Sequence, residues 1–204
     1  MSQHYDIARD LLAIKAVQIE TENYFTWTSG IKSPIYCDNR LTMSYPEVRK
    51  RIIDGFINKI KTFDVQPDVI AGCATAGIPH AAWIADRLNL PMVYVRSSPK
   101  GHGKGNQIEG IVKKNQKVLV VEDLISTGGS SIDTVNVLKS METEVIGVIA
   151  IFTYGLQKSV NQFESEKIPW TTLTNFDYII EALLEDQEIT KYDQRKLIDW
   201  RNNI

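Results

Sequence analysis

The stretch from residue 117 to residue 131 constrains the fold more than any other part of the chain. It begins with a run of four apolar residues, Val118 to Val121, which predicts a strand buried on both faces. Glu122 and Asp123 follow where that strand is expected to end, and six small residues, 126–131, form the next loop. Helical spacing of apolar residues begins after this loop. This order of elements predicts one βα unit of a parallel sheet.

The loop of this unit is suited to bind a phosphate. Gly128 and Gly129 allow a tight turn, and the N–H groups and partial positive charge at the start of the following helix favour an anion. The loop has four hydroxyl side chains but no lysine, which favours a single phosphomonoester over a nucleoside triphosphate. Glu122 and Asp123 can accept hydrogen bonds from sugar hydroxyls or hold hydrated Mg²⁺. A ribose 5-phosphate fits both halves; the alternative is an ordinary βα turn with capping hydroxyls and solvated acids.

Composition limits the class of protein. The chain has 204 residues, of which 43% are hydrophobic and 24% charged, as expected for one globular domain. A formal net charge of -2 argues against binding to bulk nucleic acid. Cys37 and Cys73 form neither a disulfide framework nor a zinc motif. The longest apolar run, 148–152, is too short to span a bilayer, and the N-terminus lacks a secretory pattern. We therefore expect a cytoplasmic protein that binds neither nucleic acid nor membrane.

Strands and helices alternate after residue 67, which predicts a doubly wound, mainly parallel sheet flanked by helices. Ligands of such sheets bind beyond the carboxyl ends of the strands, where loop 72–77, Arg96 and loop 122–130 should meet. Short β-rich pieces in 16–38 predict a small antiparallel cap. The expected strands are 68–71, 91–95, 118–121, 144–152 and 170–174; the expected helices are 2–14, 46–62, 79–88, one after residue 131, and helices over 177–204 packed on the sheet.

The sequence VLVV-ED-LI-STGGS resembles the phosphoribosyl-pyrophosphate (PRPP) motif of type I phosphoribosyltransferases. The resemblance implies the fold of that family. Loop 72–77 resembles the family's pyrophosphate loop, although some members have a lysine where Ala76 stands, so only its backbone is expected to contribute. A simple tight βα turn without a ligand is the alternative for this loop. The residues implied to bind PRPP through the motif are Glu122, Asp123, Leu124, Ile125, Ser126, Thr127, Gly128, Gly129 and Ser130.

Residues 25–40 carry the pattern F-T-x-x-S-G-x-x-S-P, which resembles the N-terminal hood of orotate phosphoribosyltransferases. Many members have a lysine where Thr28 stands, so its contact to substrate is not carried over. Tyr36 could stack on a flat ring, but alone it is better explained as a core strand aromatic. The resemblance implies that Ser126 contacts orotate. It also implies a single domain over 1–204, with the N-terminal helix and hood in 1–42 and the core in 43–204.

The segment 96–109 is predicted to be a mobile loop, because its first part is rich in glycine and serine and lacks apolar residues. It concentrates Arg96, Lys100, His102 and Lys104, which could close over a pyrophosphate leaving group; a solvated basic loop is the alternative. The spacing R-x-x-x-K-x-H followed by G-x-G resembles the catalytic flexible loop of orotate phosphoribosyltransferases, except that Ser97 replaces a lysine. The resemblance implies catalytic roles for Lys100 and His102 with Asp123, and a homodimer in which the loop reaches the neighbouring subunit.

These features together predict an orotate phosphoribosyltransferase. The resemblance implies Mg²⁺-dependent transfer of ribose 5-phosphate from PRPP to N1 of orotate, which gives orotidine 5′-monophosphate and diphosphate in de novo UMP synthesis. Mg²⁺ is expected to be held mainly through PRPP, without direct protein ligands. The alternatives are a purine or xanthine phosphoribosyltransferase, which the hood motif disfavours, and a PRPP-sensing regulator without catalysis. A dinucleotide-binding dehydrogenase is excluded, because no G-x-G-x-x-G follows a strand.

Overall fold

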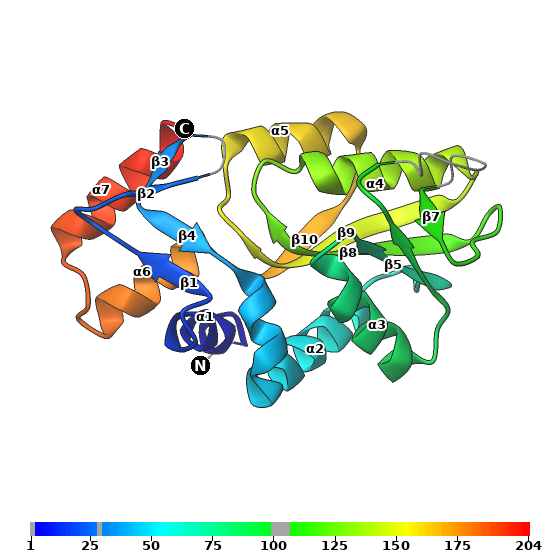
Figure 1. The fold of residues 1–204 in the computed structure, drawn as a ribbon, viewed down its shortest axis with the longest axis horizontal. Coiled ribbons are helices and arrows are strands. Elements are labelled where there is room, and N and C mark those ends of the chain that lie inside the picture. Colours follow the sequence, from blue (N-terminus) through cyan, green and yellow to red (C-terminus); the bar gives the residue numbers. More distant parts are fainter. Residues whose placement is uncertain (1–2, 28–29, 99–106) are drawn as a thin grey trace.

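The computed structural model describes residues 3–27, 30–98 and 107–204. Its centre is a six-stranded sheet in the order β10-β9-β8-β5-β6-β7, in which all neighbours are parallel except the pair β6 and β7 (Figure 1). The chain order reverses between β5 and β8, so their carboxyl ends form the switch point at which such sheets bind ligands. The strands are β5 (Val69–Cys73), β6 (Met92–Val95), β7 (Ile108–Glu109), β8 (Lys117–Ile125), β9 (Glu144–Thr153) and β10 (Trp170–Asn175).

Helices cover both faces of the sheet, which confirms the doubly wound prediction. In Figure 1, α4 and α5 lie above the sheet and α2 and α3 below it. Along β8, Leu119 and Val121 pack in one core with α1, α2, α3 and α6, whereas Val118 and Val120 pack in the other with α4 and α5. The helices are α1 (Gln3–Ala13), α2 (Pro46–Lys61), α3 (Gly77–Leu88), α4 (Gly129–Ser140), α5 (Gln157–Glu166), α6 (Phe176–Glu185) and α7 (Lys191–Asn202).

Strand β8 is longer than the sequence predicts. The expected end at Val121 was wrong, because pairing with β9 continues to Ile125. Glu122 and Asp123 therefore belong to the strand rather than to the loop after it. Two helix starts also differ from expectation: α3 begins at Gly77 rather than Pro79, and α4 begins at Gly129 rather than after Ser131.

The predicted antiparallel cap is present and forms the hood at one end of the molecule (left in Figure 1). It contains β1 (Val17–Ile19) paired with β4 (Ile35–Cys37) and β2 (Phe25–Thr26) paired with β3 (Lys32–Ser33), followed by the 3₁₀ helix η1 (Asn39–Ser44).

The C-terminal helix α7 packs on this hood. Trp200 of α7 donates a hydrogen bond from Nε1 to the Lys32 carbonyl at 3.2 Å and meets the Trp27 ring edge-on. The expectation that this segment packs on the sheet was wrong for α7. Within the described residues, no helix has both the length and the apolar character needed to cross a membrane.

Candidate active site

A cleft of about 400 Å³ lies at the carboxyl edge of the sheet, where the hood meets β8. A second cleft of about 260 Å³ shares Ala74 and Ser130 with it and extends towards Arg96. The first, which we call the carboxyl-edge cleft, is lined by Cys37, Asp38, Arg40, Ala74, Thr75, Ala76, Glu122, Asp123, Leu124 and Ser130. The structure therefore brings loop 72–77, Arg96 and the acidic pair to one edge, as the sequence predicts.

The acidic pair is held in a place poor in water. Glu122 is only 5% exposed, and its carboxylate accepts hydrogen bonds from Ser130 Oγ at 3.0 Å and from the Asp123 backbone N–H at 3.1 Å. Burial, reinforced by the neighbouring Asp123 carboxylate, raises the pKa of Glu122 above its ordinary value. Burial also raises the pKa of Asp123 above its ordinary value. Hydroxyl donors or a cation in the cleft would thus interact strongly with this pair.

The 3₁₀ helix ties the hood to the acidic pair. Asn39 is 1% exposed, and its Nδ2 donates a hydrogen bond to the Asp123 carbonyl at 2.7 Å. Because this contact joins residues far apart in the sequence, no local pattern points to Asn39. The only local signal was its place in the Cys37–Arg40 segment directly after the hood motif.

The predicted phosphate loop has the expected backbone geometry. Gly128 has φ of +90°, and a Cβ atom at Gly129 would meet nothing within 4 Å, so the start of α4 faces open space. N–H groups of this first helical turn are available to an anion. Ser126 and Thr127 are half-buried beside them.

The remaining side chains of residues 122–131 are partly engaged in contacts within the protein. The Ser130 hydroxyl already donates to Glu122, which leaves its backbone N–H for a ligand. Ile125 is 1% exposed and its carbonyl accepts a hydrogen bond from Thr153 Oγ1, whereas Leu124 lines the cleft. Ser131 is completely buried, so the expectation that its hydroxyl reaches a phosphate was wrong.

The described ends of the predicted mobile loop lie side by side, where β6 and β7 pair in antiparallel fashion. The Arg96 N–H donates to the Gln107 carbonyl at 2.9 Å, and the Arg96 guanidinium lies 3.7 Å from the Glu109 carboxylate. Residues 108–109 form strand β7, so the predicted loop 96–109 extends too far at its end. The predicted site residues Lys100, His102 and Lys104 lie outside the described residues, as does Thr28.

Backbone packing brings the connection between β5 and α3 against β8. A Cβ atom at Gly77 would lie 2.4 Å from the Val121 carbonyl oxygen, so only glycine permits this approach. The close contact places residues 74–76, including the Ala74–Thr75 cis peptide bond, on the wall of the carboxyl-edge cleft. Ala76 contributes a methyl group there and no charge.

Comparison with known proteins agrees with this geometry. The model of the phosphoribosyl transferase domain matches residues 44–185. The chain belongs to the phosphoribosyltransferase family. It is similar to the orotate phosphoribosyltransferases of Fusobacterium nucleatum (56% identity over 201 residues, 98% of this chain and 95% of the relative) and Oceanobacillus iheyensis (54% over 198 residues, 97% and 98%). The crystal structure of orotate phosphoribosyltransferase from Aeropyrum pernix is similar at 28% identity and a TM-score of 0.77, covering 87% of this chain and 97% of that one.

The hood of this phosphoribosyltransferase lies outside the matched domain, before residue 44, but within the span shared with the full-length relatives. Its aromatic residues divide into two groups. Trp27 stacks on Tyr154 at 5.0 Å between ring centroids and fixes the hood to the end of β9. Tyr36 is 39% exposed beside the cleft residue Cys37, so the expectation that it is a core aromatic was wrong. Tyr154, to which no sequence pattern points, thus provides a second link between hood and core, beside the hydrogen bond from Asn39 to Asp123.

Proposed function

We propose that this phosphoribosyltransferase transfers ribose 5-phosphate from PRPP to N1 of orotate and releases diphosphate, as a step of de novo UMP synthesis. The observation that carries the proposal is the acidic pair, with Glu122 buried and Asp123 half-buried, placed at the switch point before a glycine-rich helix start. Identity above 50% over nearly the full chain to named orotate phosphoribosyltransferases supports orotate as the base.

The acidic pair serves the ribose end of PRPP. Its carboxylates accept hydrogen bonds from ribose hydroxyls, and their negative charge favours the positive charge that develops at the sugar as orotate N1 attacks C1. Asn39 holds the backbone at Asp123 during this step, because its amide bonds the Asp123 carbonyl. Asp123 is therefore the residue that we expect to matter most for turnover.

The phosphate loop serves the other end. Backbone N–H groups of residues 126–130 and the hydroxyls of Ser126 and Thr127 hold the 5-phosphate. Ser126, the first of these residues after β8, also contacts orotate. Tyr36 offers an exposed ring on the hood side, suited to stack on the flat base.

The carboxyl-edge cleft fits Mg²⁺ only as an ion held mainly through PRPP. Among the residues that the structure describes, no group of three or more His, Cys, Asp and Glu side chains is placed to hold a metal ion, but the carboxylate oxygens of Glu122 and Asp123 line the cleft and are donors that this hard cation prefers. Glu122 and Asp123 would hold the ion through water, while the diphosphate provides its other oxygen ligands. When bound, Mg²⁺ neutralises negative charge on the leaving diphosphate.

The loop that begins at Arg96 closes over the diphosphate of a neighbouring subunit. In this proposal the protein is a homodimer, and Arg96, Lys100, His102 and Lys104 stabilise the leaving group and exclude water. The hairpin geometry at Arg96 and Gln107 supports a loop that projects from the edge of the sheet. Both cysteines are free, which is consistent with the cytoplasmic location that we propose.

One assay tests the activity. Adding PRPP and Mg²⁺ to the protein and orotate should lower the orotate absorbance and yield equimolar orotidine 5′-monophosphate. A parallel panel with adenine, hypoxanthine and xanthine should show no product. Turnover of a purine instead of orotate would replace the proposed substrate, and PRPP binding without any turnover would favour a regulator.

Sharing of the loop between subunits has its own test. Lys100→Ala and Asp123→Asn chains, each inactive alone, should regain activity when mixed. Up to about half of wild-type turnover is expected in proven mixed dimers, because one of the two sites then combines two native parts. Mixed dimers without recovered activity would mean that each site is built from one chain.

A further inference from the structure

Arg40 is the one cationic side chain among the described residues that line the carboxyl-edge cleft. Three carboxylates line the same cleft, on Asp38, Glu122 and Asp123. To the extent that these groups are charged, they would repel a diphosphate that enters here, and repulsion between charges is strong where water is scarce. A cation on this wall is needed to offset that repulsion.

The guanidinium of Arg40 is held in a defined orientation. Asp38 accepts hydrogen bonds from Arg40 Nε at 2.6 Å and Nη2 at 2.9 Å, and it also accepts one from the Arg40 backbone N–H at 3.2 Å. The Arg40 guanidinium holds the pKa of Asp38 below its ordinary value, so the pair remains charged. Asp38 uses two of about five N–H donors on the guanidinium, and the others suit phosphate oxygens. The Arg40 side chain is 62% exposed, so a ligand can reach it.

The position of Arg40 points to one part of PRPP. Its backbone follows Asn39, which is fixed to Asp123, and its side chain shares the cleft with Ala74, Thr75 and Ala76. Ala74, Thr75 and Ala76 bring no charge to their side of the cleft. Arg40 therefore brings a positive charge from the hood side to a wall that lacks one on the loop side.

We propose that Arg40 binds the diphosphate group, both in PRPP and as the released product. This inference depends on the proposed function only in taking PRPP as the substrate. It assigns Arg40 no part in holding the 5-phosphate or the base, which lie against the start of α4 and the hood aromatics.

Calorimetric titration of Arg40→Gln with three ligands in Mg²⁺ tests the assignment. PRPP and inorganic diphosphate should each bind about tenfold or more weakly than to wild type, because a charge-assisted hydrogen bond is lost. Ribose 5-phosphate and orotate should bind as to wild type. Arg40→Lys should recover part of the affinity. Arg87→Gln is the matched control, because Arg87 also pairs with an aspartate, Asp54, but lies outside the cleft.

Wild-type protein supplies a second measurement that does not depend on how the variant folds. Diphosphate should protect Arg40 from modification by phenylglyoxal, as mapped by peptide mass spectrometry, and ribose 5-phosphate should not. The inference is overturned if Arg40→Gln leaves diphosphate affinity unchanged, weakens ribose 5-phosphate equally, or weakens orotate alone. It is also overturned if diphosphate gives no protection. Absence of orotate turnover in wild type, with protection intact, would instead refute the proposed function.

Discussion

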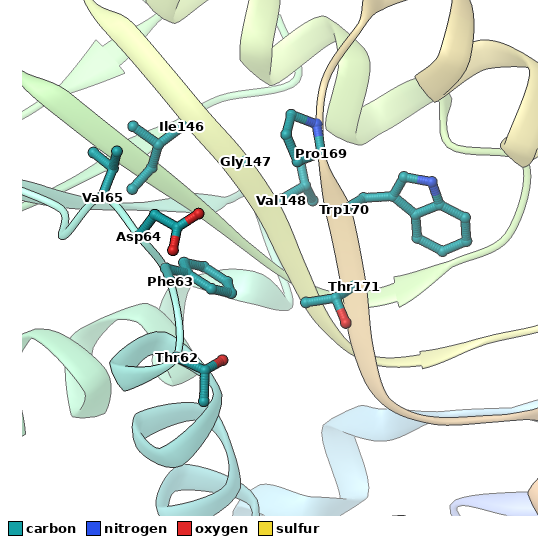
Figure 2. A pocket seen from close by; sticks show the side chains of 10 residues that line it. All are labelled: Thr62, Phe63, Asp64, Val65, Ile146, Gly147, Val148, Pro169, Trp170 and Thr171. Atoms are coloured by element: carbon teal, nitrogen blue, oxygen red, sulfur yellow. The ribbon is translucent and has the colours of Figure 1, made fainter.

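Two clefts of about 400 Å³ lie at opposite edges of the main sheet, and they differ in the chemistry of their walls rather than in volume. The carboxyl-edge cleft has three carboxylates and Arg40 on its walls. The second, which we call the amino-edge cleft, lies between the segment that follows α2 and the first residues of β9 and β10 (Figure 2). It is lined by residues 62–65, 146–148 and 169–171, and Asp64 is its one charged residue. Volume alone therefore does not identify the site.

The difference in charge between the two clefts follows from which ends of the helices lie at each edge of the sheet. Helices α3 and α4 begin at the carboxyl edge, whereas α2 ends near the amino edge. Helix starts present unpaired N–H groups, which favour anions. The carboxyl edge therefore offers more groups suited to an anionic ligand than the amino edge does.

Replacing one aspartate at each edge gives the largest expected contrast. Asp123→Asn should lower kcat by about 100- to 1,000-fold, because it removes charge that stabilises the transition state in a buried site. Asp64→Asn, at an exposed position, should change kcat by less than about twofold. Steady-state orotate consumption measures both. Asp123→Asn should melt no lower than wild type, since it removes a buried charge.

Near-normal activity of Asp123→Asn, or an equal loss in Asp64→Asn, would break the comparison between the edges. A circular-dichroism melting curve is the control for each variant, because loss of fold would imitate loss of catalysis. Asp64 is a suitable match since it is also an aspartate that lines a cleft of similar volume.

The pH dependence of stability tests the packing of α3, the helix that begins at the carboxyl edge, through its buried residue His80. This residue is 1% exposed in the first turns of α3, between the rings of Phe56 and Trp83, and burial lowers its pKa to about 4. The folded protein binds this proton less readily than the unfolded chain does. The stability that follows is therefore present above pH 6.5, the ordinary pKa of histidine, and is lost as pH falls towards 4.

Urea unfolding from pH 7 to pH 4 measures the effect of His80. Wild type should lose about 3 kcal/mol more than His80→Leu over this range, because each unit of pKa shift corresponds to about 1.4 kcal/mol. Titrating carboxylates contribute equally to both proteins, so the difference isolates His80. Parallel pH curves for the two proteins would show that burial does not suppress protonation of His80.

The sequence predicts those parts of this molecule that depend on local pattern. Apolar runs and helical spacing predict the sheet and its two covered faces, and the small residues after β8 predict the tight turn at Gly128 before α4. The end of β8 was missed because Glu122 and Asp123 are unusual in a strand, and only pairing with β9 extends it to Ile125. Local signals favour ending the strand, and the tertiary contact overrides them.

Features made by distant segments could not be predicted. The Asn39 bond to Asp123 joins positions 84 residues apart, and no local pattern encodes it. Tyr36 was expected in the core because aromatic residues in strands usually pack there, yet the described strands of the hood pair only two by two, and Tyr36 is exposed on them. The packing of helix α7 on the hood could not be predicted either. Its partner surface is made by hood residues such as Trp27 and Lys32, which lie far from α7 in the sequence.

Alanine at one glycine of each edge gives the smallest and most direct test of the comparison. A Cβ atom at Gly77 would lie 2.4 Å from the Val121 carbonyl oxygen, and one at Gly147 would lie 3.0 Å from the Pro169 carbonyl oxygen. Both substitutions should lower the free energy of unfolding, by about 1–3 kcal/mol for overpacking, with Gly77→Ala the more severe. Urea midpoints at constant m-value measure this loss. Only Gly77→Ala should also weaken PRPP binding, because the shift of α3 moves residues 74–76 on the wall of the carboxyl-edge cleft. Equal loss of PRPP affinity in Gly147→Ala would show that the two edges are coupled through the strands, and that the ligand site is not confined to one of them.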